Sequence, residues 1–405
     1  MELFLATIPA FGGILMILVL GLRKRWLLAP LIVAFSARLF TSLIHRYLFP
    51  LPQGGADALV FDRTAYEWSA GGCFASLEYF DPAGSYVYSA LLGVFYGCVG
   101  YSPIAAQVIN AALGTIAVAM LSLATARIWG QRPAVRAGYF LAIFPALIIY
   151  SSVTLRESSI LLAFSIMVYC IARFSERREL KWILAAMAAI GIATLFHGGM
   201  AMAAVGLFVG LLFMPSVGST SRPRAALGVL LVRSALAIAV VAGAAIYIDS
   251  IYLPKIGNVG ELDTELISSV VESRAQGDAA YLTGLRVASP IDVIWQAPIR
   301  LFYLLFAPFP WNVTSSAHLL GMFDGLLYAF LSLRVWQNRA TILAHPGMRV
   351  VLFVVIALAI VYAFGTSNFG TAMRHRAKFA VAAAVLVAPF LARASSRRRG
   401  GDRQS

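Results

Sequence analysis

Long apolar blocks separated by short polar segments run through this chain from one end to the other. Most of the blocks reach roughly 17 to 25 residues, the length that crosses a bilayer as an α-helix. They cover residues 3–22, 26–48, 103–128, 137–153, 158–174, 180–196, 200–214, 226–248, 318–336, 349–364 and 378–394. The pattern predicts an all-α, polytopic transmembrane protein with about 11 spans, forming one integral membrane domain over residues 1–405.

Two further segments are predicted to enter or lie on the membrane without crossing it. If residues 86–100 crossed, the helix at 103–128 would run outward and leave Arg127, Arg132 and Arg136 outside, against the usual enrichment of Arg and Lys in cytoplasmic loops. The segment 292–312 carries three prolines, which interrupt helices. Both are therefore predicted to be re-entrant or interfacial elements.

The distribution of basic residues orients the chain. The basic run 23–25 predicts a cytoplasmic turn, so the N-terminus lies outside. Residues 49–102 then form a first outer loop, residues 249–312 a second outer loop, and residues 393–405 a basic cytoplasmic tail. Residues 1–22 have no basic leading segment and are interpreted as a first span, not a removed signal.

Composition agrees with a membrane protein. The charged fraction is 12% and the mean hydropathy is +0.82, whereas soluble domains carry about 25% charged residues. The net charge of +14 comes from arginines at the ends of apolar blocks, which indicates topology and membrane lipids as surroundings, not nucleic acid. Cys73, Cys98 and Cys170 are odd in number and scattered, which argues against a disulfide framework and against a metal site.

The first outer loop contains an acidic and aromatic island at residues 56–68. Asp62 in this island is the candidate catalytic base, because a carboxylate near the membrane surface can take a proton from a hydroxyl. The i, i+4 spacing places Asp62 and Tyr66 on one helix face. The alternative is that Asp62 is the N-cap of a surface helix.

A cationic cluster near residue 374 runs against the topology rule, because it lies on the predicted outer side. Arg374 and Lys378 are spaced i, i+4 and can present two charges together to phosphate oxygens. The alternative is that they reach lipid headgroups. The other candidate substrate-binding residues on this side are Asp57, Arg63, Tyr66, Arg156, His197, Arg300, His375 and Arg376, and Glu157 is a second candidate catalytic residue.

Several short motifs together resemble the GT-C-type glycosyltransferases, in particular proteins similar to protein O-mannosyltransferases and lipid A aminoarabinose transferases. The island contains Phe-Asp-Arg-Thr-Ala-Tyr at 61–66, and the half-helix after it ends in Phe-Tyr-Gly-Cys-Val-Gly-Tyr-Ser at 95–102. Further matching stretches are 106–115, 126–130 and 144–152. The similarity is clearest over residues 57–175.

This resemblance implies a polyprenyl-phosphate-linked sugar donor and an inverting transfer to a hydroxyl of a glycan, lipid or protein. It implies Asp62 as the base and an active site facing the periplasm or exterior of the plasma (inner) membrane. The family often pairs this aspartate with a neighbouring acid. Here Arg63 takes that place, so the second carboxylate is left among Asp57, Glu67 and Glu157.

Other functions remain open at this point. Residues 154–157 and 368–376 also resemble O-antigen-type oligosaccharide repeat-unit polymerases, which use polyprenyl-pyrophosphate-linked glycans. A lipid-linked sugar transporter or flippase is a lesser alternative, in which Arg38, Asn110 and Asp324 would meet near the bilayer midplane. No nucleotide-binding motif is present. The sequence names no certain cofactor and leaves room for a divalent cation such as Mg²⁺ or Mn²⁺.

Overall fold

The computed structural model describes residues 1–51, 54–214, 252–253, 257–258, 279–285 and 289–391. The predicted span at 226–248, much of the second outer loop and the basic tail at 393–405 lie outside the described residues.

The named elements of the described chain are all helices, apart from one short antiparallel strand pair, β1 (Tyr252–Leu253) with β2 (Gly257–Asn258). The helices are α1 (Glu2–Arg23), α2 (Arg25–Tyr47), α3 (Ala56–Trp68), η1 (Ala75–Tyr79), α4 (Val87–Val99), α5 (Pro103–Trp129), α6 (Gln131–Ala142), α7 (Pro145–Tyr150), α8 (Glu157–Arg177), α9 (Leu180–Phe196), η2 (Gly198–Ala201), α10 (Met202–Leu212), α13 (Pro290–Phe306), η5 (Pro310–Asn312), α14 (Ser316–Gln337), α15 (Arg339–Ala344), α16 (Pro346–Phe364), α17 (Phe369–Ala377), η6 (Ala380–Ala382), α18 (Ala383–Leu386) and η7 (Ala388–Phe390).

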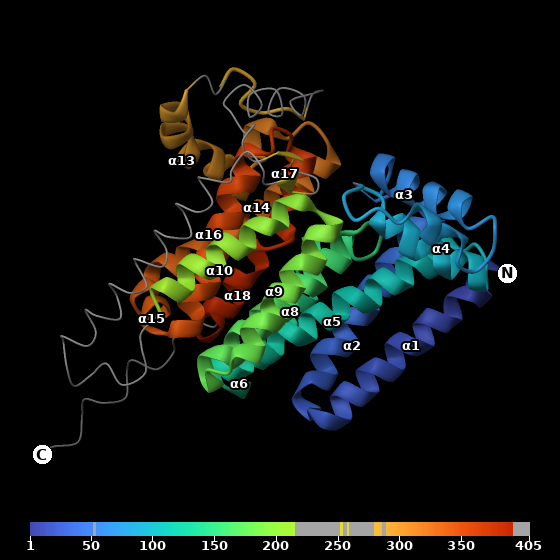
Figure 1. Cartoon of the computed structure of the whole chain (residues 1–405), viewed down its shortest axis with the longest axis horizontal. Coiled ribbons are helices and arrows are strands. Elements are labelled where there is room, and N and C mark those ends of the chain that lie inside the picture. Colours follow the sequence, from blue (N-terminus) through green and yellow to red (C-terminus); the bar gives the residue numbers. More distant parts are fainter. Residues whose placement is uncertain (52–53, 215–251, 254–256, 259–278, 286–288, 392–405) are drawn as a thin grey trace, which may run out of the picture.

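Six helices of the described chain are long and apolar enough to cross a membrane, namely α1, α2, α5, α8, α14 and α16. Shorter apolar helices, α9 and η2–α10 among them, stand beside these six. The prediction of a polytopic all-α membrane protein is confirmed. Helix α5 is the most buried of the six and packs against α1, α2, α6 and α8, so it forms the centre of the N-terminal half (Figure 1).

Helix α4 has 13 residues and is therefore about 20 Å long. A bilayer core is about 30 Å thick, so α4 is too short to cross it. It packs instead along α3 and η1 (Figure 1). This matches the prediction of a half-helix at residues 86–100.

Two predicted spans are not single helices. The block at 137–153 is divided between α6 and α7, because Pro145 has no N–H and disfavours a helical conformation in the residue before it. Arg38 of α2 donates to the Ala142 carbonyl at this break (3.2 Å). Of the block at 378–394, the described residues 378–391 form the short turns η6, α18 and η7. They are almost wholly covered by other helices, which is where irregular backbone is tolerated at membrane depth.

The proline-rich segment 292–312 is more regular than predicted. Helix α13 starts with a capping box between Ser289 and Asp292 and continues through Pro298 to Phe306. The backbone leaves the helix only at Ala307–Pro308. One lost backbone hydrogen bond at Pro298 is tolerated because α13 packs against α14, α16 and α17.

The interpretation of the cysteines as unpaired is wrong for two of them. Cys73 and Cys98 form a disulfide with a Cα–Cα distance of 4.0 Å, and Cys170 is free and buried. Gly97 explains why the backbone around Cys98 can approach the backbone around Cys73. A Cβ at Gly97 would lie 2.2 Å from the Gly72 carbonyl oxygen, so only a glycine lets these two segments touch. Sequence spacing carries no information about this contact.

At the end of the helix bundle that includes α6 and α15, Arg127 pairs with Glu176 (3.2 Å). Helices α3, α4 and α17 lie toward the other end (Figure 1). The polar groups described next gather around α3 and α17.

Candidate active site

Glu157 lies at the centre of a buried ionic cluster. It is the first residue of α8 and is 3% exposed. Its Oε1 lies 3.1 Å from Nε of Arg374 and 3.6 Å from Nζ of Lys378. Arg374 also donates through Nη1 to Asp57 of α3 (2.5 Å). The cluster therefore joins α3, α8 and α17, which are far apart in sequence.

This cluster carries an excess of positive charge. Three cations, Arg156, Arg374 and Lys378, face two carboxylates, Glu157 and Asp57. Lys378 is buried, and its Nζ lies 3.6 Å from the carboxylate of Glu157, an ion pair longer than an ordinary hydrogen bond. Buried charges are stable when they are paired and hydrogen-bonded. The arrangement is therefore suited to receive an additional anion.

Local sequence explains how α17 presents its cations. Asn368 caps the helix by accepting from the backbone N–H groups of Gly370 and Thr371. Arg374 and Lys378, four residues apart, then face the same side, as predicted. Arg376 projects about 200° away from Arg374, since each helical residue turns by about 100°.

The loop before Glu157 is held by a polar side chain inside a spanning helix. Asn110 of α5 donates to the carbonyls of Val153 (2.6 Å) and Leu155 (2.9 Å). Ser152 in the same loop donates to the carbonyl of Arg38 (2.9 Å). These bonds satisfy irregular backbone at the α7–α8 junction and fix the position where α8 begins.

Asp62 lies in the middle of α3, so the interpretation of it as an N-cap is wrong. It is 8% exposed and accepts hydrogen bonds from the hydroxyls of Tyr96 (2.5 Å) and Tyr101 (2.7 Å). The Tyr66 ring packs on Tyr101, with centroids 4.4 Å apart. Burial raises the pKa of Asp62 above its ordinary value although both hydrogen bonds oppose this shift. A carboxylate with a raised pKa, held by two hydroxyls, is suited to accept a proton.

The remaining predicted residues are distributed as follows. Arg63 is exposed and pairs with Glu67 (2.7 Å). Arg156 donates to the Ser85 carbonyl (3.2 Å), and its guanidinium lies 5.3 Å from the centre of the Phe61 ring. The next residue, Glu157, forms its ion pair with Arg374 of α17.

The two predicted histidines lie beside the ionic cluster. His375 bonds Thr366 (2.7 Å), and its ring packs on His197 and Tyr362. Nζ of Lys378 lies 5.5 Å from the centre of the same Tyr362 ring. The Tyr362 ring therefore lies between the histidine pair and the ammonium group of Lys378.

Two predicted arginines have their own internal partners. Arg376 is fully buried and pairs with Asp324 (2.9 Å). Arg300 donates to Gln296 (2.9 Å) and to the Leu285 carbonyl (2.6 Å). Both arginines are therefore held by structural partners, and within the described residues neither forms an ion pair with Glu157.

Sequence reasoning missed the residues that hold the candidate catalytic groups. Tyr96 and Tyr101 were part of a matching motif but received no role, and Asn110 was considered only as an intramembrane polar residue. The hydroxyls of Tyr96 and Tyr101 lie 34 and 39 residues after Asp62, so no helical spacing connects them to it. A polar residue inside an apolar helix is the signal that would have found Asn110.

Within the described residues no group of three or more His, Cys, Asp or Glu side chains is close enough to hold a divalent metal ion. The carboxylate at the centre of the cluster, Glu157, already faces three cations, and such surroundings disfavour a further cation.

Comparison with known proteins gives the class. Residues 82–247 match the protein family described as dolichyl-phosphate-mannose-protein mannosyltransferase. No curated protein matches the chain. The match, together with the set of apolar helices, supports a membrane glycosyltransferase of the GT-C kind. The matched range includes Glu157, Tyr96 and Asn110, and it begins after Asp62.

The pKa of Asp62 leads to a prediction for pH dependence. A base must be ionised, so a base role for Asp62 predicts that activity falls as the pH drops through the pKa of Asp62, which burial raises. Tyr96→Phe removes a hydrogen bond that stabilises the carboxylate, so this pKa rises further and the acid limb of the kcat/KM profile should move to higher pH. A pH–rate profile of both proteins measures the shift. Tyr79→Phe is the control, because that ring stacks on Trp68. An unmoved acid limb would contradict the role of Asp62.

Proposed function

We propose that this glycosyltransferase moves a sugar from a polyprenyl-phosphate carrier to a hydroxyl acceptor at the outer face of the membrane, with inversion. The observation that carries the proposal is the buried cluster in which Arg374, Lys378 and Arg156 outnumber the carboxylates Glu157 and Asp57. Guanidinium and ammonium groups stabilise the charge that develops on a departing phosphate.

Arg374 supports this assignment by its geometry. Its side chain is 13% exposed and holds two carboxylates, one buried at Glu157 and one 55% exposed at Asp57. A phosphate can therefore replace Asp57 on the more accessible side of the guanidinium while Glu157 stays in place. Glu157 then serves as the counter-ion that keeps both cations in position, and not as the base.

Asp62 is the base in this proposal because it is the carboxylate held by hydroxyls instead of cations. Tyr88 of α4 lies within electrostatic reach of both Asp62 and Glu157, so the two acidic sites are neighbours. A phosphate leaves without protonation, so one base suffices and no general acid is required.

Two features support an outer-facing site. The Cys73–Cys98 disulfide ties the turn before η1 to α4, the helix whose Tyr96 bonds Asp62, and disulfides persist in oxidising compartments outside the cytoplasm. The cations near Arg127 lie at the opposite end of the bundle, where the positive-inside rule expects the cytoplasm.

The arrangement of intramembrane polar groups does not favour a transporter. Arg38 bonds the carbonyls of Ala34 and Ala142, Asn110 bonds the loop before α8, and Asp324 bonds Arg376. Each of these three groups has its own partner. They do not form the single midplane site that alternating access requires.

The test is transfer by the purified protein from a panel of polyprenyl-phosphate and polyprenyl-pyrophosphate sugars, with Arg374→Gln beside the wild type. We expect transfer from a monophosphate donor. Loss of a hydrogen bond to a charged group costs about 1.5 to 3 kcal/mol, so Arg374→Gln should lower kcat/KM by roughly 10- to 100-fold.

Arg63→Gln is the matched control, because that arginine is exposed and pairs with Glu67 on the same outer face. Its kcat/KM should equal that of the wild type. Polymerisation from the pyrophosphate donors alone would replace the proposal with an oligosaccharide polymerase. Equal rates for Arg374→Gln and the wild type would remove the phosphate site from this cluster.

A further inference from the structure

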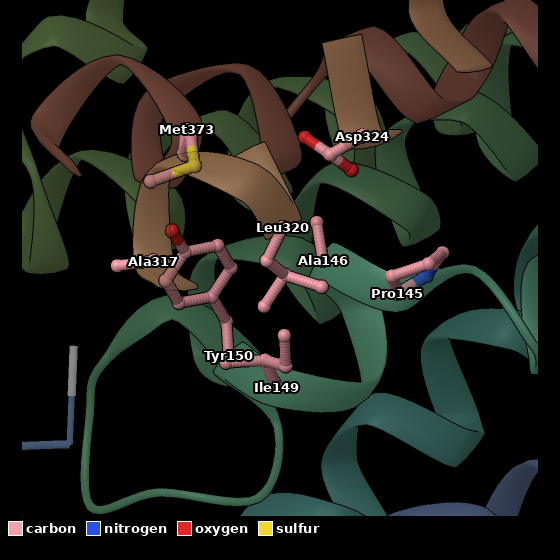
Figure 2. A pocket seen from close by; sticks show the side chains of 8 residues that line it. All are labelled: Pro145, Ala146, Ile149, Tyr150, Ala317, Leu320, Asp324 and Met373. Atoms are coloured by element: carbon pink, nitrogen blue, oxygen red, sulfur yellow. The ribbon is translucent and has the colours of Figure 1, made fainter. Parts of the chain in front are cut away.

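The enclosed cavity that Figure 2 shows is too small to hold a substrate. It lies between α7, α14 and α17 and has room for about one water molecule. The neighbouring space beside Glu157 and Lys378 also has room for about one water molecule. The part of the site that an acceptor can reach is thus the outer surface around Asp62, where Tyr101 is 44% exposed.

Tyr101 belongs to a short segment, residues 100–104, that joins α4 to α5. Its hydroxyl donates to Asp62 (2.7 Å), so the position of this segment decides whether the bond can form. Gly100 has a φ of 123°, a conformation that glycine adopts readily, and a Cβ there would lie 3.1 Å from Cδ1 of Leu5 in α1. The segment therefore packs closely against the first helix.

Glu2, the first residue of α1, binds the same segment at two points. Its backbone carbonyl accepts from the hydroxyl of Ser102 (3.0 Å), and its carboxylate accepts from the backbone N–H of Ile104 (3.3 Å). Ser102 is also the N-cap of α5, and a carboxylate at the start of a helix is favoured by the helix dipole. Glu2 thus fixes the backbone that directly follows Tyr101.

Arg46, in the last turn of α2, holds the Glu2 carboxylate with two hydrogen bonds. Its Nε and Nη2 donate to the two carboxylate oxygens at 2.8 and 3.0 Å. Such a fork fixes the direction of a carboxylate as well as its position. The two side chains are 39% and 27% exposed, and an ion pair of this kind adds little to stability. What the pair does is join α1, α2 and the start of α5 next to Tyr101.

We propose that Glu2 and Arg46 are positioning residues for the reaction at Asp62. Their ion pair holds the segment 100–104 against α1, so that the Tyr101 hydroxyl stays on Asp62. Their opposite charges also balance each other beside that carboxylate. This role rests on the proposed function, because it requires Asp62 to be the base.

The electrostatic influence on Asp62 supports the second part of this role. From outside α3, the charge of Arg46 lowers the pKa of Asp62 and the charge of Glu2 raises it. Because the two effects oppose each other, removal of either charge leaves the other one acting alone. The two substitutions should therefore move the pKa of Asp62 in opposite directions.

The other ionisable groups close to Asp62 carry no net charge. Arg63 and Glu67 of the same helix are exposed and pair with each other. The remaining groups are the phenols of Tyr66, Tyr88, Tyr96 and Tyr101. Burial raises the pKa of the last three, so they stay uncharged in the pH range of an assay.

The experiment measures the pH profile of kcat/KM for Glu2→Gln and Arg46→Met beside the wild type. Glu2→Gln keeps an oxygen for the Ile104 N–H and removes the negative charge, so the acid limb should move to lower pH. Arg46→Met removes the positive charge and releases Glu2, so the acid limb should move to higher pH. Each shift should be about half a pH unit, as for charges that are partly exposed.

Three controls separate charge from fold. Arg46→Lys keeps the charge and should return the acid limb toward its wild-type position. Arg127→Met removes an arginine from an ion pair of similar exposure, with Glu176, and should leave the acid limb in place. At about 1 M salt the Debye length is about 3 Å, so the shifts in Glu2→Gln and Arg46→Met should become smaller. Thermal unfolding of each variant shows that it is folded.

A double-mutant cycle tests the positioning of Tyr101. At pH values above the acid limb, Tyr101→Phe and Arg46→Met should each lower kcat/KM by roughly tenfold, because Asp62 loses one of the two hydroxyls that orient it. The double variant should be no slower than Tyr101→Phe, since both changes remove the same contact. Losses that multiply in the double variant would show that Arg46 does not act through Tyr101.

The outcomes separate this inference from the proposed function. If Tyr96→Phe moves the acid limb but Glu2→Gln and Arg46→Met leave it in place or move it in one direction, the inference is overturned and Asp62 stays the base. A large loss of stability in Arg46→Met with an unmoved limb in Glu2→Gln assigns the pair to structure and also overturns the inference. An acid limb that none of these variants moves, Tyr96→Phe included, rejects Asp62 as the base and the inference with it.

Discussion

Replacing Asp62 by Asn is expected to lower kcat for sugar transfer by about 10² to 10⁴-fold, the usual contribution of a general base. The amide has nearly the size of the carboxylate and can still meet Tyr96 and Tyr101, so the protein should remain folded and inserted. The amide cannot accept the proton of the acceptor hydroxyl. The measurement is kcat at saturating donor and acceptor, with thermal unfolding of the same samples to show that the fold is intact.

Asp81→Asn is the control for this variant. Asp81 is an exposed carboxylate in the same outer loop and accepts a hydrogen bond from the Ala83 backbone (2.9 Å). It should transfer sugar at the wild-type rate. Full activity of Asp62→Asn would exclude this carboxylate as the base, and Glu157 would then be the next carboxylate to test.

Arg376→Met is expected to destabilise the protein by about 3 to 5 kcal/mol, the cost of removing one partner from a buried ion pair. The change leaves Asp324 without its cation. It also removes the donors that Arg376 gives to the carbonyls of Leu305, Ala307 and Gly321. The measurement is the unfolding free energy in mixed micelles or the amount of monodisperse protein after heating.

A second substitution makes this prediction specific. Arg376→Met with Asp324→Leu removes both charges, so the double variant should regain part of the lost stability. Arg63→Met should change the unfolding free energy little, because the Arg63–Glu67 pair is exposed. If Arg376→Met were as stable as the wild type and lost donor binding, Arg376 would belong to the substrate site.

Arg374 and Arg376 show which properties of a side chain can be predicted from the sequence and which cannot. Both arginines were predicted to bind substrate because both lie on the outer side and break the charge bias. On α17 they point to opposite sides, so one meets Glu157 and the other meets Asp324. The helical spacing was readable from the sequence, but the burial of each side depends on α8 and α14, which come from distant parts of the chain.

The candidate site was predicted in part. The i, i+4 pair of Arg374 and Lys378, the outer position of Asp62 and the importance of Glu157 were all expected, and the structure brings Arg374, Lys378 and Glu157 together. The hydroxyls that hold Asp62 and the amide of Asn110 were not. Each depends on a contact between helices, and such contacts leave no periodic signal in the sequence.

The sequence alone was sufficient for the class of protein, the predominance of apolar helices and the short helix beside the acidic island. These follow from the length of apolar runs and the distribution of arginine, because the bilayer imposes both on any chain that crosses it. The tertiary structure decided which charges are paired, where predicted spans break, and which cysteines meet. Those outcomes depend on packing between distant segments, where one side chain's partner is chosen by geometry and not by its neighbours in sequence.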